Sequence, residues 1–212
     1  ILAGTKPNST LIDMSTVSPN ISSKIAKLTQ ERNMNYLRAP VNGTIMQAEN
    51  STLVIIVSGS KEIFDEHKPI FELMGSKIFY VGDGEQARYL KLVINMMVGI
   101  SSIMTAEALA LGNAGGLDWQ LMIDIIKNSA VGSPLIQYKE NTLKNRDYTP
   151  AFSAIQMAKD FDLILDAGKA KNIPLPMAAQ TRQNWSSMIA TGRGEKDYFG
   201  YLELIEELSG LT

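Results

Sequence analysis

An ammonium and a carboxamide stand four residues apart in the most apolar long stretch of the chain, Leu90 to Leu111. Lys91 and Asn95 therefore share one face of the helix that this stretch predicts. Burying an ammonium on an apolar helix is costly unless it has a partner or a role, and desolvation lowers the pKa of a lysine toward the range useful for proton transfer. The spacing is therefore compatible with Lys91 as a general acid or base, and it leaves a second interpretation open. The alternative is a first-turn lysine whose head group reaches solvent.

The composition excludes several other chemistries. The chain has no cysteine, which removes disulfides, thiolate nucleophiles and cysteine metal sites together. His67 is the only histidine, so a multi-histidine metal site is impossible and we expect no metal. The 20 Lys and Arg residues nearly balance the 22 Asp and Glu residues, which offers no general attraction to nucleic acid or anionic membranes. The polar residues within Leu90 to Leu111 favour a buried central helix over a membrane span.

The first 84 residues alternate strand and helix signals. Apolar, β-branched runs at residues 11–14, 53–57 and 77–81 predict strands. Ser18-Pro19 forms an N-cap and first-turn pair before one helix, and residues 63–74 form the apolar face of another. Apolar strands separated by helices favour a mainly parallel sheet that is covered on both faces.

From residue 85 onward we find no convincing strand. A very long helix is predicted from about residue 86 to 114, and Asp118 is expected to cap the next helix. Further helices are predicted near 154–170, 177–190 and from about 196. The fold class is therefore α/β followed by all-α. We expect residues 1–84 to be part of a dinucleotide-binding (Rossmann-type) domain, and residues 85–212 to be a helical substrate or dimerisation domain built on the long interdomain helix.

The nucleotide fingerprint Gly-x-Gly-x-x-Gly, which a doubly wound domain carries at its first β–α turn, has no match in that context. The pairs Gly82-x-Gly84 and Gly192-x-Gly194 lack a third glycine at the right spacing. A parallel sheet of so few strands would leave apolar faces and an edge uncovered. We infer that the chain is an N-terminally incomplete copy of a larger domain, and we expect it to be inactive by itself without that cofactor-binding unit.

Residues 80–97 resemble the catalytic motif of the β-hydroxyacid dehydrogenases. This family includes 3-hydroxyisobutyrate dehydrogenase, tartronate semialdehyde reductase and the glyoxylate/succinic semialdehyde reductases. In its pattern a lysine follows the first glycine by nine residues and an asparagine follows the lysine by four, as Gly82, Lys91 and Asn95 do here. The resemblance implies that Lys91 and Asn95 are the catalytic residues.

Three further segments match the family in the same order along the chain. Residues 13–19 resemble the segment whose threonine contacts the cofactor, which implies that role for Thr16. Residues 39–44 resemble the substrate-binding turn, whose backbone N–H groups hold a carboxylate. Residues 152–160 resemble a cofactor-side segment. The substrate-binding residues implied are Asn42, Gly43 and Thr44, and the further cofactor-binding residues are Phe152 and Lys159.

The chain also departs from the family's pattern. Glu85 and Ala87 replace two glycines of the catalytic motif. In the substrate turn, Arg38 replaces an acid, Asn42 a serine and Thr44 a glycine. These substitutions leave the identity of the substrate open.

The resemblance implies an NAD(P)-dependent oxidoreductase that interconverts a small β-hydroxy or 2-hydroxy carboxylic acid and its semialdehyde or keto form. One alternative is a non-catalytic fragment or dimerising module of such an enzyme. Another is an imine-reductase-like or 6-phosphogluconate-dehydrogenase-like reductase. Imine reductases generally lack the lysine, and 6-phosphogluconate dehydrogenases carry a His-Asn pair where this chain has Ile94-Asn95.

NAD and NADP both remain open as cofactors, because the residue that reads the ribose 2′ position follows the fingerprint. A long, nearly all-apolar helix is difficult to cover with short helices alone, so we expect a homodimer or higher homo-oligomer formed by the helical part. The absence of cysteine suits a reducing cytoplasm. We expect no nucleic-acid or membrane partner.

Overall fold

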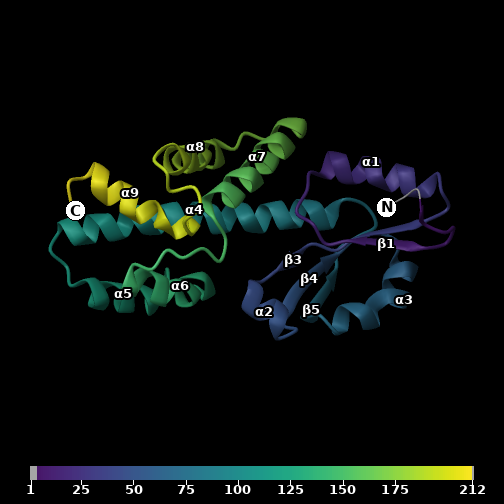
Figure 1. Ribbon diagram of the computed structural model, residues 1–212, viewed down its shortest axis with the longest axis horizontal. Coiled ribbons are helices and arrows are strands. Elements are labelled where there is room, and N and C mark those ends of the chain that lie inside the picture. The colour runs from purple at the N-terminus through teal and green to yellow at the C-terminus, as the bar shows by residue number, and fades with distance from the viewer. Residues whose placement is uncertain (1–3, 212) are drawn as a thin grey trace. The chain divides into compact units, whose positions relative to one another are not determined.

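The computed structural model describes residues 4–211. Strands occur in the N-terminal part of the sequence, and the described residues after 80 contain helices and no named strand (Figure 1). The elements in chain order are β1 (Thr10–Asp13), α1 (Pro19–Gln30), β2 (Asn35–Arg38), β3 (Val41–Asn42), α2 (Ile45–Glu49), β4 (Leu53–Val57), α3 (Lys61–Glu72), β5 (Gly75–Tyr80), α4 (Gln86–Ala114), α5 (Trp119–Lys127), α6 (Pro134–Asn145), α7 (Ala154–Ala170), α8 (Pro176–Ala190), the 3-10 helix η2 (Tyr198–Gly200) and α9 (Tyr201–Leu208).

By their backbone contacts the residues form two compact units. Unit 1 comprises Ile1–Ile94 and Leu163–Pro174, and unit 2 comprises Asn95–Asp162 and Leu175–Thr212. The boundary that we expected between residues 84 and 85 marks where strands stop, whereas the units divide within α4 and again within α7. The difference arises because the first turns of α4 and the last turns of α7 make their contacts within unit 1. The division into domains 1–84 and 85–212 stays a prediction.

The strands of unit 1 form two small sheets, β1–β2 and β3–β4–β5, and the pairing direction changes within the extended segment that joins them, residues 35–42. β2 pairs in parallel with β1, and β3 pairs antiparallel with β4. An antiparallel bridge between Arg38 and Ser58 continues the β3–β4 register, and β4 and β5 pair in parallel. The mainly parallel pairing is therefore confirmed, with one antiparallel step that the sequence did not predict. This step places Asn42 and Gly43 directly after the strand that carries Arg38.

Two helices cover these strands. α1 connects β1 to β2 and α3 connects β4 to β5, and Figure 1 shows the two helices on opposite faces of the strands. Ser18 Oγ accepts a hydrogen bond from the N–H of Ile21 at 3.1 Å, which confirms the predicted N-cap of α1. The buried core of this region comprises Leu37, Ala39, Ile55, Val57, Phe64 and Phe71.

The long helix α4 occurs where the apolar pattern predicted it. By length and composition alone it meets the criterion for a membrane-spanning helix, with a mean hydropathy of 1.6 in its most apolar window. The polar residues within it were therefore not sufficient by themselves to argue against a membrane span. Of that window, 44% is buried inside the protein. Asn95, Ser102 and Thr105 are among its buried residues, which suits a helix packed in a protein core.

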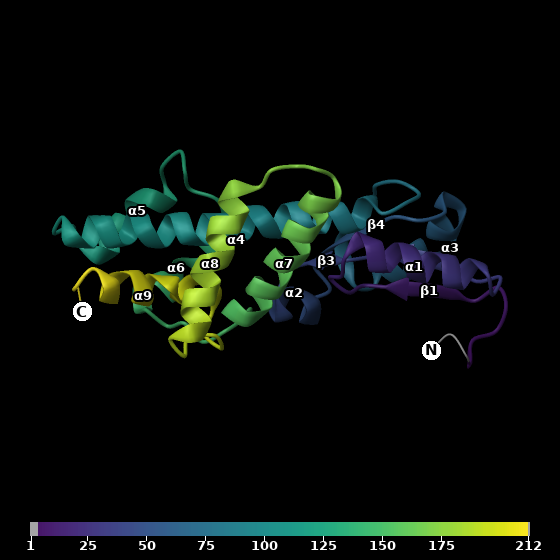
Figure 2. The ribbon, with the colours of Figure 1, turned by 90° about the horizontal axis from the view of Figure 1, so that it is seen from above.

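Unit 2 packs around α4 and an aromatic cluster. Figure 1 shows α8 on one side of the C-terminal half of α4, and α5 and α6 on the other side. Trp185 is fully buried, and the rings of Phe161, Tyr198 and Tyr201 approach it edge-on at 6.3–6.5 Å between centroids. Such edge-to-face contacts add to the stability gained from apolar burial. Figure 2 shows the long course of α4 from a second direction.

Four elements were not predicted from the sequence: β2, β3, α2 and α6. β3 and α2 are too short to produce a periodic pattern, and the buried face of α6 includes a charged residue, Lys139. Lys139 Nζ lies 2.6 Å from Asp197 Oδ2, and both side chains are almost completely buried. In a sequence pattern, a lysine counts as a polar residue and therefore indicates an exposed face. The ion pair with Asp197, which is distant in the sequence, explains why Lys139 is buried.

Candidate active site

Lys91 contacts the predicted substrate turn directly. Its Nζ donates a hydrogen bond to Asn42 Oδ1 at 3.0 Å, between residues 49 positions apart in the sequence. Lys91 is half-buried in the second turn of α4, and Asn42 ends β3. The structure therefore brings the proposed proton-transfer group and the proposed substrate-binding turn together within unit 1.

The turn that follows β3 needs glycine at one position. Gly43 has a φ of 141°, and a Cβ at this position would lie 2.7 Å from Leu53 Cδ2. The next residue, Thr44, donates from its backbone N–H to Gln47 Oε1 at 2.9 Å, and its hydroxyl donates to the same oxygen. Gln47 therefore occupies donors that the resemblance assigned to a substrate carboxylate. The sequence analysis did not identify Gln47, although its position three residues after Thr44 is typical of a capping box.

Thr16 follows the carboxyl end of β1, where open parallel sheets bind dinucleotides. It is half-buried, and the preceding Ser15 is exposed. A backbone turn that is accessible at this end of a parallel strand fits the cofactor contact expected of Thr16.

A buried charge network surrounds this turn. Arg88 Nη2 lies 2.6 Å from Asp13 Oδ2, and the Tyr36 hydroxyl donates to the same carboxylate oxygen at 2.9 Å. Burial acts to raise the pKa of Asp13, but the hydrogen bond from the Ser15 N–H and the positive charge of Arg88 outweigh it and lower that pKa below its ordinary value. Burial raises the pKa of Tyr36. Asp13 is therefore an anion and Tyr36 a neutral donor at neutral pH.

Two of the chain's departures from the family pattern form an ion pair. Arg38 Nε donates to Glu85 Oε1 at 3.0 Å, and Arg38 Nη2 donates to the same oxygen. Both side chains are largely buried. The basic residue before the substrate turn and the acidic residue before α4 therefore neutralise each other, and each explains the presence of the other.

In unit 2, Asn95 is held by Asp160, the last residue of the segment 152–160 that resembles the family's cofactor side. Asn95 Nδ2 donates to Asp160 Oδ2 at 2.5 Å, and both residues are buried. Gly99, one turn after Asn95, allows this approach, because a Cβ there would lie 2.3 Å from the ring of Phe161. This hydrogen bond orients the Asn95 amide, with its nitrogen directed to Asp160.

The remaining predicted cofactor residues also lie in unit 2. Lys159 Nζ is 2.8 Å from Asp160 Oδ1, and its side chain is 56% exposed. Phe152 is half-buried and packs edge-on against the ring of Tyr198 at 6.3 Å between centroids. Asp160 therefore links Lys159 to Asn95, whereas Phe152 contacts the ring of Tyr198, which is outside the predicted set.

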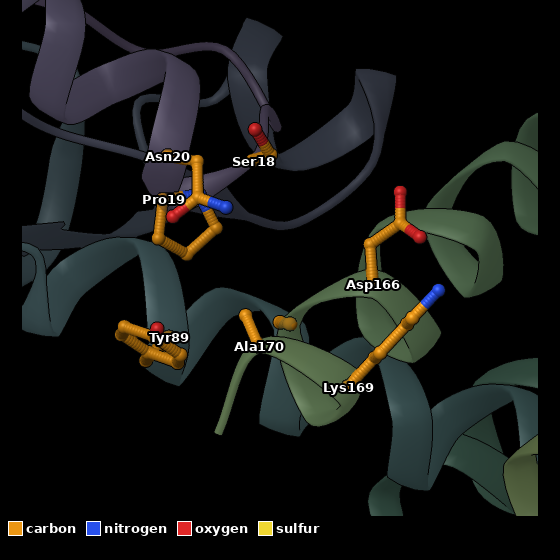
Figure 3. A pocket seen from close by; sticks show the side chains of 8 residues that line it. Ser18, Pro19, Asn20, Tyr89, Asp166, Lys169 and Ala170 are labelled. Atoms are coloured by element: carbon orange, nitrogen blue, oxygen red, sulfur yellow. The ribbon is translucent and has the colours of Figure 1, made fainter. Parts of the chain in front are cut away.

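A cavity of about 430 Å³ opens elsewhere in unit 1. Figure 3 shows the start of α1, the side chain of Tyr89 and the end of α7 around it. Tyr89 precedes Lys91 by two residues, which places their side chains on different sides of α4. None of the eight lining residues is a predicted site residue, so this cavity is separate from the surroundings of Lys91. Within residues 4–211, no group of three or more Asp, Glu or His side chains is arranged to hold a metal ion.

Two sequence-family models match the chain. Residues 85–205 match the model described as NAD-binding of NADP-dependent 3-hydroxyisobutyrate dehydrogenase. Residues 1–82 match the NAD binding domain of 6-phosphogluconate dehydrogenase. The order of the two matches agrees with the predicted succession of a Rossmann-type region and a helical region.

Individual proteins extend this similarity over the whole chain. The 2-(hydroxymethyl)glutarate dehydrogenase of Eubacterium barkeri is 34% identical over 213 residues, which cover 100% of this chain and 71% of that protein. The NAD-dependent L-serine dehydrogenase of Pseudomonas aeruginosa is 31% identical, with 99% of this chain and 73% of that protein covered. The structure of Mycobacterium tuberculosis 3-hydroxyisobutyrate dehydrogenase with L-serine superposes with a TM-score of 0.88 at 26% identity, covering 97% and 72% of the two chains.

The fold and these similarities define an NAD(P)-dependent oxidoreductase of hydroxy acids. The chain belongs to the β-hydroxyacid dehydrogenase family. Its helical part on a long helix, preceded by a Rossmann-type region, is the fold that the sequence resemblance implied.

The contact between Asn95 and Asp160 yields a testable prediction. Replacing Asp160→Asn removes the charged acceptor that orients the Asn95 amide, and loss of such a buried charged hydrogen bond costs about 1.5–3 kcal/mol. We expect kcat to fall about tenfold or more in the enzyme as it occurs in the cell. Steady-state kinetics measure this, with Asp162→Asn as the control, because Asp162 lies on the same helix with a 56% exposed side chain. A folded Asp160→Asn enzyme with wild-type kcat would contradict the positioning of Asn95 by Asp160.

Proposed function

We propose that this protein interconverts a small β-hydroxy or 2-hydroxy carboxylic acid and its semialdehyde or keto form, with Lys91 as the general acid and base. The observation that carries this proposal is the 3.0 Å hydrogen bond from Lys91 Nζ to Asn42 Oδ1. It joins the lysine of the catalytic motif to the turn expected to bind the substrate. An ammonium held beside a substrate-binding turn is placed to exchange a proton with the substrate oxygen.

The nicotinamide cofactor supplies hydride chemistry when it is bound. During oxidation, neutral Lys91 would accept the proton of the substrate hydroxyl, and the bound nicotinamide would supply the hydride acceptor. During reduction, the Lys91 ammonium returns a proton to the carbonyl oxygen. Asn42 holds the amine of Lys91, and the resemblance assigns Asn95 to the catalytic residues. Thr16, Phe152 and Lys159 are assigned to the cofactor.

The carboxylate of the substrate is assigned to the turn at Gly43 and Thr44. Gln47 Oε1 already accepts hydrogen bonds from the Thr44 N–H and hydroxyl. A neutral amide oxygen in this position is a weaker acceptor than a carboxylate, so a carboxylate can replace it. The proposal is therefore compatible with an acid substrate and requires Gln47 to move aside.

Two alternatives are less well supported. Lys91 argues against an imine-reductase-like reaction, since imine reductases generally lack this lysine. Ile94 in place of a histidine argues against 6-phosphogluconate as substrate. A non-catalytic fragment or dimerising module remains the alternative that a binding measurement separates from the enzyme.

Calorimetric or fluorescence titration of the 212-residue chain with NADH and NADPH tests the function and chooses between the cofactors. Tight binding of either would exclude the non-catalytic fragment. In the enzyme as it occurs in the cell, we expect Lys91→Ala to lower kcat by about a thousandfold or more, because it removes the group that transfers the proton. The affinity for the cofactor should stay unchanged. A kcat equal to that of the wild type would remove Lys91 from this role.

We further propose that the protein is a homodimer through its helical unit. Met97, Met104 and Leu111 repeat every seven residues on α4, which places them on one side of the helix. These three residues form an apolar stripe, and they are 64%, 56% and 76% exposed. Leu121 and Ile125 on α5 add further exposed apolar surface in the same unit. Large exposed apolar surface of this kind is typical of protein–protein interfaces.

Sedimentation equilibrium at micromolar concentration tests the dimer. Met104→Glu introduces a charge into the middle of the apolar stripe, and we expect it to weaken association at least about tenfold. Leu73→Glu is the matched control, because Leu73 is 75% exposed but lies outside the stripe in unit 1. A wild-type protein that is monomeric at this concentration would contradict the proposed dimer.

The cellular setting is also a proposal. The absence of cysteine and the balanced charges support a protein of the cytoplasm without nucleic-acid or membrane partners. Cell fractionation that recovers the native protein with membranes or nucleic acid would contradict this assignment.

A further inference from the structure

Arg88 is a buried cation for which the proposed reaction has no direct use. Its side chain is 1% exposed, although an unpaired guanidinium would be very costly to bury. It donates to four acceptors, all in unit 1: Asp13 Oδ2 at 2.6 Å, the Ser15 carbonyl at 2.5 Å, the Tyr36 hydroxyl at 3.0 Å and Ser22 Oγ at 3.2 Å.

The bond to the Ser15 carbonyl has a geometric consequence for Thr16. The carbonyl of Ser15 and the N–H of Thr16 belong to one planar peptide group. A guanidinium that holds this carbonyl therefore also sets the direction of the Thr16 N–H. The N–H of Ser15 is fixed as well, because it donates to Asp13 Oδ1 at 3.0 Å. Both peptide groups of Ser15 are thus held by the Arg88–Asp13 pair.

Arg88 also precedes Lys91 by three residues on α4. Residues three apart lie on the same side of a helix. One short stretch of α4 therefore carries both the group that holds the Ser15–Thr16 peptide and the lysine assigned to proton transfer. Because the guanidinium is planar and rigid, its bonds restrict the turn more than a flexible ammonium would.

We propose that Arg88 is a positioning residue for the nicotinamide dinucleotide. It fixes the Ser15–Thr16 peptide so that Thr16 meets the cofactor at a set position relative to Lys91. This inference rests on the proposed function, and it assigns a role to a residue that the resemblance did not identify. The alternative is a purely structural role, in which Arg88 only stabilises the fold, as any member of the buried network would.

Tyr36 separates the two explanations. Its hydroxyl contacts Asp13, Ser22 and Arg88 in the same network, but it makes no hydrogen bond to Ser15. Tyr36→Phe therefore removes three contacts of the network and leaves the bond from Arg88 to the Ser15 carbonyl in place. A purely structural network would respond to Tyr36→Phe as it responds to loss of Arg88.

The test compares Arg88→Met, Arg88→Lys and Tyr36→Phe. In Arg88→Met we expect the KM for the dinucleotide to rise about tenfold while kcat changes little, since one set of charged hydrogen bonds that orders the turn is lost. Arg88→Lys should recover part of this loss, because an ammonium can keep the bond to Asp13. This variant also tests the inference if Arg88→Met does not fold. Tyr36→Phe should leave the KM near that of the wild type. An equal rise in Tyr36→Phe, or an unchanged KM in folded Arg88 variants, would overturn the inference.

A second readout does not depend on activity. The exchange rate of the Ser15 amide hydrogen, measured by NMR, should rise about tenfold in the Arg88 variants and stay near the wild-type rate in Tyr36→Phe. If the enzyme as it occurs in the cell bound neither NADH nor NADPH, the proposed function would fail, and this exchange rate would still decide whether Arg88 orders the turn. Unchanged exchange in the Arg88 variants would exclude that ordering.

Discussion

A polar or charged side chain on an apolar helix must find a partner, because burying it unpaired costs several kcal/mol. This constraint governs α4. Arg88 is paired with Asp13, Lys91 with Asn42 and Asn95 with Asp160. The partners of Arg88 and Lys91 come from the strands of unit 1, and the partner of Asn95 comes from α7. The need to pair Arg88, Lys91 and Asn95 therefore determines which strands and helices lie beside them.

The strands of unit 1 meet this requirement by an irregular step. A purely parallel order would continue from β2 through a helix to the next strand. Instead, residues 35–42 leave β1 and pair antiparallel with β4, with Arg38 bridged to Ser58 at the change. This change brings Asn42 to the side chain of Lys91. The antiparallel step is thus the feature of the fold on which the contact between Lys91 and the predicted substrate turn depends.

The departures from the family pattern are coupled to one another. Arg38 and Glu85 are both unusual at their positions, and each neutralises the other in a largely buried pair. Thr44, in place of a glycine, acquires a partner in Gln47. The surroundings of the predicted substrate turn therefore depart from the family pattern, whereas Lys91 and Asn95 match it. Such a pattern is expected when relatives share the reaction and differ in the acid that they bind.

The amino-acid sequence alone determined the local elements and the motif residues. The apolar runs located β4 and α4, Ser18 and Asp118 marked helix starts, and the spacing of Gly82, Lys91 and Asn95 indicated the family. These features depend on neighbours within one turn or one strand, so the sequence contains them directly. The roles proposed for Thr16, Phe152 and Lys159 remain predictions.

Only the tertiary structure decided which distant side chains meet. Arg88 and Asp160 gave no periodic signal that would mark them for a site, and α6 was missed because its buried face includes Lys139. Each of these residues is explained by a partner that the chain brings near by folding, as Asp197 is for Lys139. The free energy of a buried polar group depends on such a partner and not on sequence neighbours, which is why no pattern in the sequence could have revealed it.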